Sequence, residues 1–135
     1  MKDNTIIHVA CAVIWKDTSL FAAQRGDNHS LAGYWELPGR KIGPGEMPET
    51  CIVRELQEEL GIRVLPIQTL QWVEHHYEDI AVRLYPVICE LHSEGFELYE
   101  HKDAGWFNEQ SSLRLQWLEA DIPIVKKLFI DKEVS

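Results

Sequence analysis

The stretch that most constrains the fold of this chain is residues 48–61, which carries a stripe of apolar side chains at helical spacing. Pro48 suits the first turn of a helix, and Gly61 suits the position just after its last turn. The stripe consists of Ile52, Val53, Leu56 and Leu60. The pattern therefore predicts one amphipathic helix that ends at Gly61 and buries this stripe.

Three glutamates, Glu55, Glu58 and Glu59, fall together on a face of the same helix beside the stripe. Like charges three or four residues apart on a helix repel each other. Hard divalent cations such as Mg²⁺ prefer carboxylate oxygens and would relieve that repulsion. A solvated glutamate face is the common alternative, and three glutamates alone favour it. The residues before the helix therefore decide between the two interpretations.

Residues 34–46, "YWELPGRKIGPGE", form a loop with three glycines and two prolines that is anchored by apolar side chains. A glycine-rich loop can bring backbone groups close to a phosphate chain. Arg54, beside the glutamates, can pair with a carboxylate and fix its orientation. Loop, acidic helix and metal together suit the hydrolysis of a phosphate anhydride, because a divalent ion screens phosphates and generates hydroxide from water.

The rest of the chain reads as strands followed by a final helix. We expect strands at 6–15, 20–25, 62–77, 80–92 and 105–108, with the first two forming a hairpin, and a helix at 119–131. This order predicts an α/β (α+β) layered fold with helices packed on a mixed sheet. A length of 135 residues suits one domain, residues 1–135.

The composition of the chain limits the classes of partner that it can bind. The formal net charge of −9 argues against a nucleic-acid polymer, which is usually bound by a basic face. No apolar run approaches the roughly 18 residues of a membrane-spanning helix, so we expect no membrane partner. Three cysteines, Cys11, Cys51 and Cys89, are far apart and form no metal-binding pattern, which predicts reduced, buried thiols in a cytoplasmic protein.

Residues 39–62, "GRKIGPGEMPETCIVRELQEELGI", strongly resemble the Nudix box, the signature of the Nudix hydrolase family. That pattern is a glycine, five residues, a glutamate, seven residues, then Arg-Glu-apolar-x-Glu-Glu-x-Gly-apolar. Glu46 and every position from Arg54 to Ile62 match it. One position departs: the first glycine of the pattern is Arg40 here, and Gly39 precedes it. Arg40 puts the turn geometry in question and could add a cation near the phosphates.

The resemblance extends over nearly the whole chain. The segments "AAQR", "GYWELPG", "YEHKDAGWF" and "EADIPIV" are similar to the MutT branch, in detail to bacterial CTP pyrophosphohydrolase and 8-oxo-dGTP diphosphatase types. The resemblance implies an α/β/α sandwich with a mixed sheet, in a monomer or homodimer. It also implies cleavage of a nucleoside triphosphate to the monophosphate and pyrophosphate with Mg²⁺ or Mn²⁺.

The resemblance assigns expected roles to individual residues. The implied metal ligands are Glu55, Glu58, Glu59, Glu100 and the Gly39 carbonyl, with Glu55 as a favoured general base and Glu100 as an alternative. Glu46 and Arg54 would form an orienting ion pair. The implied phosphate contacts are Arg25, Arg40 and Lys41. Tyr34 and Trp35 could flank the base, and Asp121 either contacts the base edge or caps the final helix.

Two alternatives stay open at this point. One is a Nudix hydrolase that acts on a nucleoside diphosphate derivative such as ADP-ribose, which the lack of an extra N-terminal region disfavours. The other belongs to a different class: a non-catalytic nucleotide-binding module. The intact carboxylates of the box argue against such a module, and Arg40 keeps it open.

Overall fold

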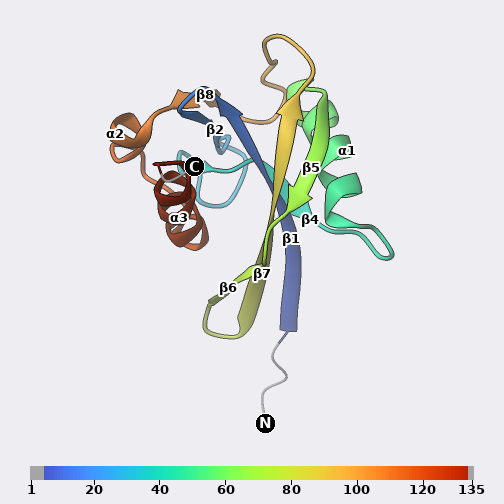
Figure 1. Cartoon of the computed structure of the whole chain (residues 1–135). Helices are drawn as coiled ribbons and strands as arrows, with labels where there is room; N and C mark the ends of the chain where they lie inside the picture. Colours follow the sequence, from blue (N-terminus) through green and yellow to red (C-terminus); the bar gives the residue numbers. More distant parts are fainter. Residues whose placement is uncertain (1–4, 134–135) are drawn as a thin grey trace.

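The computed structural model describes residues 5–133, and within them the strands form one mixed, eight-stranded sheet (Figure 1). The strands are β1 (Thr5–Lys16), β2 (Ser19–Gln24), β3 (Trp35–Glu36), β4 (Gly39–Lys41), β5 (Val64–Thr69), β6 (Val73–His76), β7 (Ile80–Leu91) and β8 (Asp103–Phe107). Their order is β3-β2-β1-β7-β5, with β4 on β1, β6 on β7 and β8 on β2. Strands β1 and β7 run parallel and the other pairs run antiparallel, so the predicted mixed sheet is confirmed.

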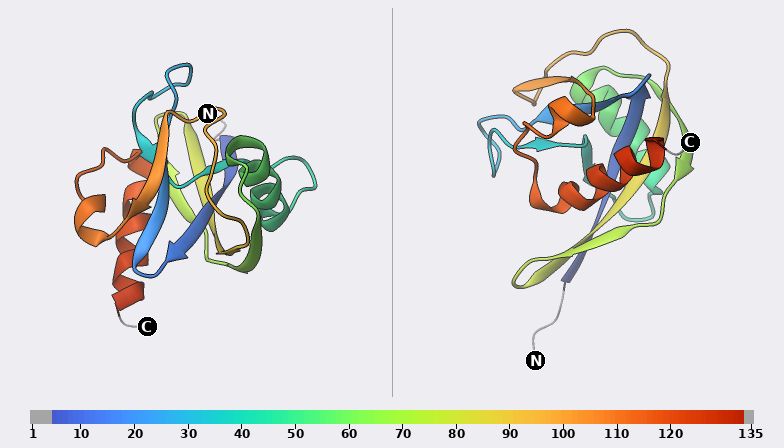
Figure 2. Two further views of the ribbon diagram at one scale, coloured as in Figure 1. Left: turned by 90° about the horizontal axis from the view of Figure 1, so that it is seen from above. Right: turned by 60° about the vertical axis from the view of Figure 1, so that its left-hand side comes forward.

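Helices cover the sheet from two sides. Helix α1 (Pro48–Leu60) lies on one side, and α3 (Ile122–Glu133) lies on the other, as the two views of Figure 2 show. Strand β1 serves both layers, because alternate residues of a strand point to opposite faces. One core joins Ala10, Ala12 and Ile14 to α1, and the other joins Cys11 and Val13 to α3. The α/β/α sandwich is therefore confirmed.

Helix α1 has the predicted boundaries. Gly61 follows it with a φ of 64°, a left-handed conformation that glycine adopts without strain, and its amide donates to the Gln57 carbonyl at 3.1 Å. The predicted apolar stripe of α1 is confirmed only in part. Ile52, Leu56 and Leu60 are fully buried, whereas Val53 is 39% exposed, and Cys51 takes the fourth buried place.

The structure differs from the sequence prediction between residues 62 and 77, where we expected one long strand. It has two, β5 and β6, separated by residues 70–72. The β5–β7 pairing shifts register between Pro66 and Gln68, and proline has no amide hydrogen for a sheet ladder. The short strands β3 and β4 lie in the segment that we expected to be loop, because two or three residues carry no readable periodicity.

The C-terminal part contains short helical pieces before α3. Helix α2 (Glu109–Ser112) was not predicted, and its first turn is capped by the Asn108 side chain, which accepts from the Ser111 amide at 2.8 Å. A 3-10 turn, η1 (Glu119–Asp121), leads into α3, so the predicted helix at 119–131 is confirmed with a later α-helical start.

The cysteine prediction is confirmed in part. Cys11, Cys51 and Cys89 are all buried and free of disulfides. Burial raises the pKa of Cys51 to about 11 and that of Cys89 to about 12, so these thiols stay protonated at neutral pH. Among residues 5–133, no helix is long and apolar enough to cross a membrane.

Candidate active site

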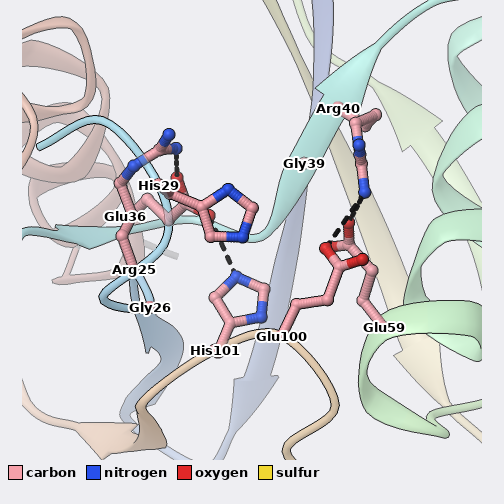
Figure 3. A pocket seen from close by; sticks show the side chains of 9 residues that line it. All are labelled: Arg25, Gly26, His29, Glu36, Gly39, Arg40, Glu59, Glu100 and His101. Atoms are coloured by element: carbon pink, nitrogen blue, oxygen red, sulfur yellow. Dashed lines mark hydrogen bonds and ion pairs between the residues drawn. The ribbon is translucent and has the colours of Figure 1, made fainter. Parts of the chain in front are cut away.

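A cleft of about 110 Å³ lies between the end of β2, strands β3 and β4, helix α1 and the loop before β8 (Figure 3). It is lined by Arg25, Gly26, His29, Glu36, Gly39, Arg40, Glu59, Glu100 and His101. The volume is below the roughly 300 Å³ at which ligand pockets usually begin. The cleft is therefore large enough for part of a nucleotide, such as its phosphate chain, and the rest would lie outside it.

Two glycines bring the walls of the cleft together. A Cβ on Gly39 would lie 2.1 Å from the Ala10 carbonyl oxygen, so only glycine lets β4 approach β1 this closely. A Cβ on Gly26 would lie 2.3 Å from the Glu100 carbonyl oxygen. Gly26 thus lets the loop before β8, which carries Glu100, pack directly against the end of β2.

Three carboxylates, which we call the carboxylate cluster, meet at one end of the cleft: Glu55 and Glu59 from α1 and Glu100 from the loop before β8. Glu55 and Glu59 are buried, whereas the Glu100 side chain is 45% exposed. The Arg40 guanidinium lies among all three, and Figure 3 shows it with Glu59 and Glu100. Its Nε donates to Glu55 at 3.2 Å, and its Nη2 donates to Glu59 and, at 3.2 Å, to Glu100.

Arg40 sits in strand β4, paired with Ala10 of β1, and the left-handed residues of the described chain do not include it. The backbone at position 40 therefore needs no glycine here, which answers the question that the departure from the box raised. Burial raises the pKa of Glu59 to about 7, with a smaller contribution from Glu55, and the hydrogen bond and charge of Arg40 oppose that rise.

A second arginine supports the cluster from outside. Arg54 donates from Nη2 to Glu46 at 3.0 Å and from Nη1 to Glu55 at 2.6 Å. Glu46 also accepts the Gly43 amide at 3.1 Å, and these bonds, above all those from Arg54, hold the pKa of Glu46 below its usual value. The predicted ion pair between Glu46 and Arg54 is present, and it links the glycine-rich loop to Glu55.

The three glutamates that were predicted to fall together on one face of α1 differ in their exposure. The Glu58 side chain is 60% exposed, lies 3.5 Å from Arg54, and does not line the cleft. At about 100° per residue, Glu55 and Glu59 lie about 40° apart around the helix axis, whereas Glu58 and Glu59 lie about 100° apart. Glu59 is the member of the three that lines the cleft, and Glu55, close to it around the helix axis, joins it through the Arg40 guanidinium.

Polar side chains line the other end of the cleft, and the sequence analysis predicted only one of them. Arg25 donates to Glu36 at 2.9 Å, and the other Glu36 oxygen lies 3.0 Å from His101 Nε2 (Figure 3). His101 Nδ1 is buried without a hydrogen-bond partner in the described chain. Arg25 was predicted, whereas Glu36, His29 and His101 were missed. A glutamate inside the apolar "YWELPG" segment was the available signal.

Asp121 lies apart from the cleft lining and is fully buried. Its carboxylate accepts the Leu37 amide at 2.8 Å, which joins η1 to the segment between β3 and β4 rather than to the first turn of α3. Burial raises the pKa of Asp121 to about 7. Glu36 adds to that rise, and the Leu37 amide and Arg25 oppose it.

Three predicted substrate contacts do not line the cleft: Tyr34, Trp35 and Lys41. The Trp35 ring packs edge-on against Phe107, with ring centroids 5.1 Å apart. The Tyr34 carbonyl accepts the Arg25 amide at 2.8 Å. Lys41 ends β4 with an exposed side chain. The structure thus gives Trp35 a packing contact at the place where we expected a base-flanking ring.

The cluster has the chemistry of a Mg²⁺ or Mn²⁺ site, because carboxylate and carbonyl oxygens are the ligands that hard cations prefer. In residues 5–133, however, no three His, Cys, Asp or Glu side chains converge closely enough to hold a metal ion as they stand. The guanidinium of Arg40 fills the space between the oxygens. The donor chemistry of the cluster therefore fits a divalent ion, and in this structure the Arg40 guanidinium is bound among those oxygens.

Comparison with known proteins places this site in a family. A family model described as the NUDIX domain matches residues 5–128. The chain belongs to the NUDIX family. This Nudix hydrolase is 40% identical to the "8-oxo-dGTP diphosphatase" of Proteus vulgaris over 85 residues, 62% of this chain and 76% of the relative. It is 30% identical to the "CTP pyrophosphohydrolase" of Escherichia coli (strain K12) over 125 residues, 90% of each chain.

The fold of the Nudix hydrolase is also that of a solved relative. The crystal structure of MutT protein from Methanosarcina mazei Go1 matches it with a TM-score of 0.82 at 23% identity, and the match covers 100% of both chains. The named relatives are diphosphatases or pyrophosphohydrolases, so the enzyme is a hydrolase that acts on pyrophosphate bonds. Nudix hydrolases generally need a divalent metal.

Proposed function

We propose that this Nudix hydrolase cleaves nucleoside triphosphates to the monophosphate and pyrophosphate, with Mg²⁺ or Mn²⁺ as cofactor. The observation that carries the proposal is the carboxylate cluster, in which two buried glutamates of α1 meet Glu100 at the edge of a cleft. The substrate is a CTP or dCTP type of nucleotide, or an oxidised one such as 8-oxo-dGTP. The names of the relatives in Proteus vulgaris and Escherichia coli support that choice.

In the proposed reaction the glutamates hold the metal ion and activate water, and Arg54 and Glu46 orient them. The expected metal ligands are Glu55, Glu58, Glu59, Glu100 and the Gly39 carbonyl, and the ion they hold would screen the phosphates and activate water. Glu55 takes the proton of the attacking water as general base. Arg54, which already donates to Glu55 at 2.6 Å, orients that carboxylate, and Glu46 holds Arg54 in place.

Substrate binding uses the remaining polar groups. Arg25 lines the cleft and, with Arg40 and Lys41, would contact the phosphates. Asp121 would read the base edge, with Tyr34 and Trp35 beside the base. Because its pKa is raised to about 7, Asp121 can carry a proton near neutral pH and then both donates and accepts a hydrogen bond. An amino-bearing base such as cytosine or guanine suits that group.

The test is to measure pyrophosphate release with Mg²⁺ and with Mn²⁺ from CTP, dCTP, 5-methyl-dCTP, dGTP and 8-oxo-dGTP. We expect one base to be preferred by about tenfold, which corresponds to roughly 1.4 kcal/mol in transition-state binding. Glu59→Gln should abolish release. Glu94→Gln, which removes the same charge from an exposed loop residue, should leave it unchanged. Release of inorganic phosphate in place of pyrophosphate would contradict the proposed bond cleavage.

One observation favours a second candidate, a non-catalytic nucleotide-binding module: Arg40 already pairs with all three carboxylates of the cluster. The same panel separates the two. Nucleotide binding in calorimetry, without product from any nucleotide in either metal, would favour the module. The ADP-ribose-like alternative is tested by adding that compound to the panel.

A further inference from the structure

The position of Arg40 suggests a role beyond phosphate binding. A guanidinium is a permanent cation with donors in a fixed plane, and this one contacts carboxylates from two different parts of the fold. Glu55 and Glu59 come from α1, and Glu100 comes from the loop before β8. A divalent ion would need the same oxygens. Two cations cannot share this position, because they repel each other and compete for the same lone pairs.

We propose that Arg40 is a tethered cation that occupies the metal position of the cluster, so that a divalent ion binds only by displacing it. The inference rests on the proposed metal-dependent function. The three carboxylates surround the Arg40 guanidinium, which keeps their oxygens apart. This explains why, within residues 5–133, no three metal-ligating side chains lie close enough together to hold an ion. The oxygens are arranged around a guanidinium instead.

The geometry allows the displacement, because the cation can leave while the carboxylates cannot. The Arg40 side chain is 46% exposed, whereas the Glu55 and Glu59 side chains are only 6% and 8% exposed. The backbone of Arg40 is fixed by the pairing of β4 with β1. Only the side chain has to move, and the way out leads along the cleft that Arg40 itself lines.

The displaced guanidinium stays beside the cleft, whose lining also includes Arg25. Phosphate groups are the natural new partners for a guanidinium that has lost its carboxylates. A nucleotide that enters with a metal ion therefore offers Arg40 a second partner, whereas a metal ion alone does not. Metal and nucleotide should consequently bind with positive cooperativity, each strengthening the other by the same factor.

The first experiment measures Mn²⁺ affinity by electron paramagnetic resonance, without nucleotide, in the unmodified protein and in Arg40→Gly and Arg40→Gln. We expect both variants to bind Mn²⁺ at least about tenfold more tightly, since the competing cation is gone. Arg114→Gln is the matched control, because it removes the same charge from an exposed residue between α2 and η1. Its Mn²⁺ affinity should equal that of the unmodified protein.

The second experiment repeats the titration with a non-hydrolysable nucleoside triphosphate analogue present. The analogue should tighten Mn²⁺ binding more in the unmodified protein than in Arg40→Gln, where no guanidinium needs a new partner. The rise in melting temperature on adding Mn²⁺ alone gives an independent readout and should be larger in both Arg40 variants. A circular dichroism spectrum like that of the unmodified protein establishes that each variant is folded.

The outcomes separate this inference from the proposed function. Equal Mn²⁺ affinity in all proteins, or weaker binding in Arg40→Gln and Arg40→Gly, would overturn the tethered cation and leave the metal site standing. No Mn²⁺ binding in any protein would mean that the metal site itself, and with it the proposed function, is wrong. Tighter binding in both Arg40 variants supports the inference even if no nucleotide in the panel is hydrolysed.

Discussion

Two buried acidic groups, Glu59 in the carboxylate cluster and Asp121 on η1, meet the cost of burial in different ways. Glu59 has a guanidinium within hydrogen-bonding distance, and so does its neighbour Glu55. Asp121 has one backbone amide, and burial raises its pKa to about 7. Burial disfavours a charged carboxylate unless a cation or enough donors compensate it. Burial still raises the pKa of Glu59 to about 7, the same value as for Asp121, so the two groups differ in what opposes the rise: a guanidinium for Glu59 and mainly one backbone amide for Asp121.

The largest expected effect tests whether the charge of the cluster is used in catalysis. Glu55→Gln keeps the shape of the side chain and removes its charge, so it removes both the general base and one metal ligand. We expect kcat to fall on the order of a thousandfold, because metal activation is worth several kcal/mol. Steady-state kinetics at saturating Mg²⁺ measures it. A loss below tenfold would show that the charge of Glu55 is not needed.

The next effect tests whether Asp121 holds a proton. Its folded-state pKa is raised, so the folded protein binds this proton more tightly than the unfolded chain, and the stabilisation is lost as pH rises through about 7. Between pH 5 and pH 8 this group should lower the free energy of unfolding by roughly 2–3 kcal/mol. Asp121→Asn keeps an oxygen for the Leu37 amide and should remove that contribution.

Urea denaturation at several pH values measures the difference between the unmodified protein and Asp121→Asn. Asp131→Asn is the control, because Asp131 forms an exposed pair with Lys127 on α3. Its stability curve should run parallel to that of the unmodified protein. If the Asp121→Asn curve also ran parallel, Asp121 would be ionised throughout, and one backbone amide would be enough to keep a buried carboxylate charged.

The smallest expected effect tests whether Arg54 orients the Glu55 carboxylate of the cluster. Arg54→Lys keeps the charge but cannot reach Glu46 and Glu55 with separate nitrogens as the guanidinium does. We expect kcat to fall about tenfold, the lower end for residues that orient metal ligands. The free energy of unfolding should stay close to that of the unmodified protein, because the Arg54 side chain is 42% exposed. Equal kcat would leave Arg54 without an orienting role.

The parts of the fold with a clear period were predictable from sequence. Helix α1 has eleven residues between Pro48 and Leu60 in which the apolar spacing can be read, and the end at Gly61 follows from its backbone freedom. Strand β1 was found because its continuous run of apolar, β-branched residues is typical of a buried strand. The two-residue strand β3 and the break between β5 and β6 were not, since they depend on pairing with distant strands.

The site was predictable where a linear spacing defines it and not where the fold brings distant residues together. Glu55, Glu46 and Arg54 lie within one linear motif, and the contact between Glu46 and Arg54 was expected from the resemblance of that motif to the Nudix box. The contact of Glu36 with His101 joins residues 65 positions apart, and no spacing predicts it. The sequence showed that Arg40 departs from the glycine of the Nudix box. Its contact with Glu100 could not be predicted, because it depends on how the loop before β8 packs.

Strand β1 has a consequence for anyone who wishes to redesign this enzyme. Its residues 10–14 are fully buried on both faces, Ala10 and Ala12 toward α1 and Cys11 and Val13 toward α3. A larger side chain at any of them must displace a helix or the neighbouring strand, and a smaller one leaves a void. Changes of substrate preference are therefore best sought in the loops at the cleft, and β1 is the part of the protein to leave untouched.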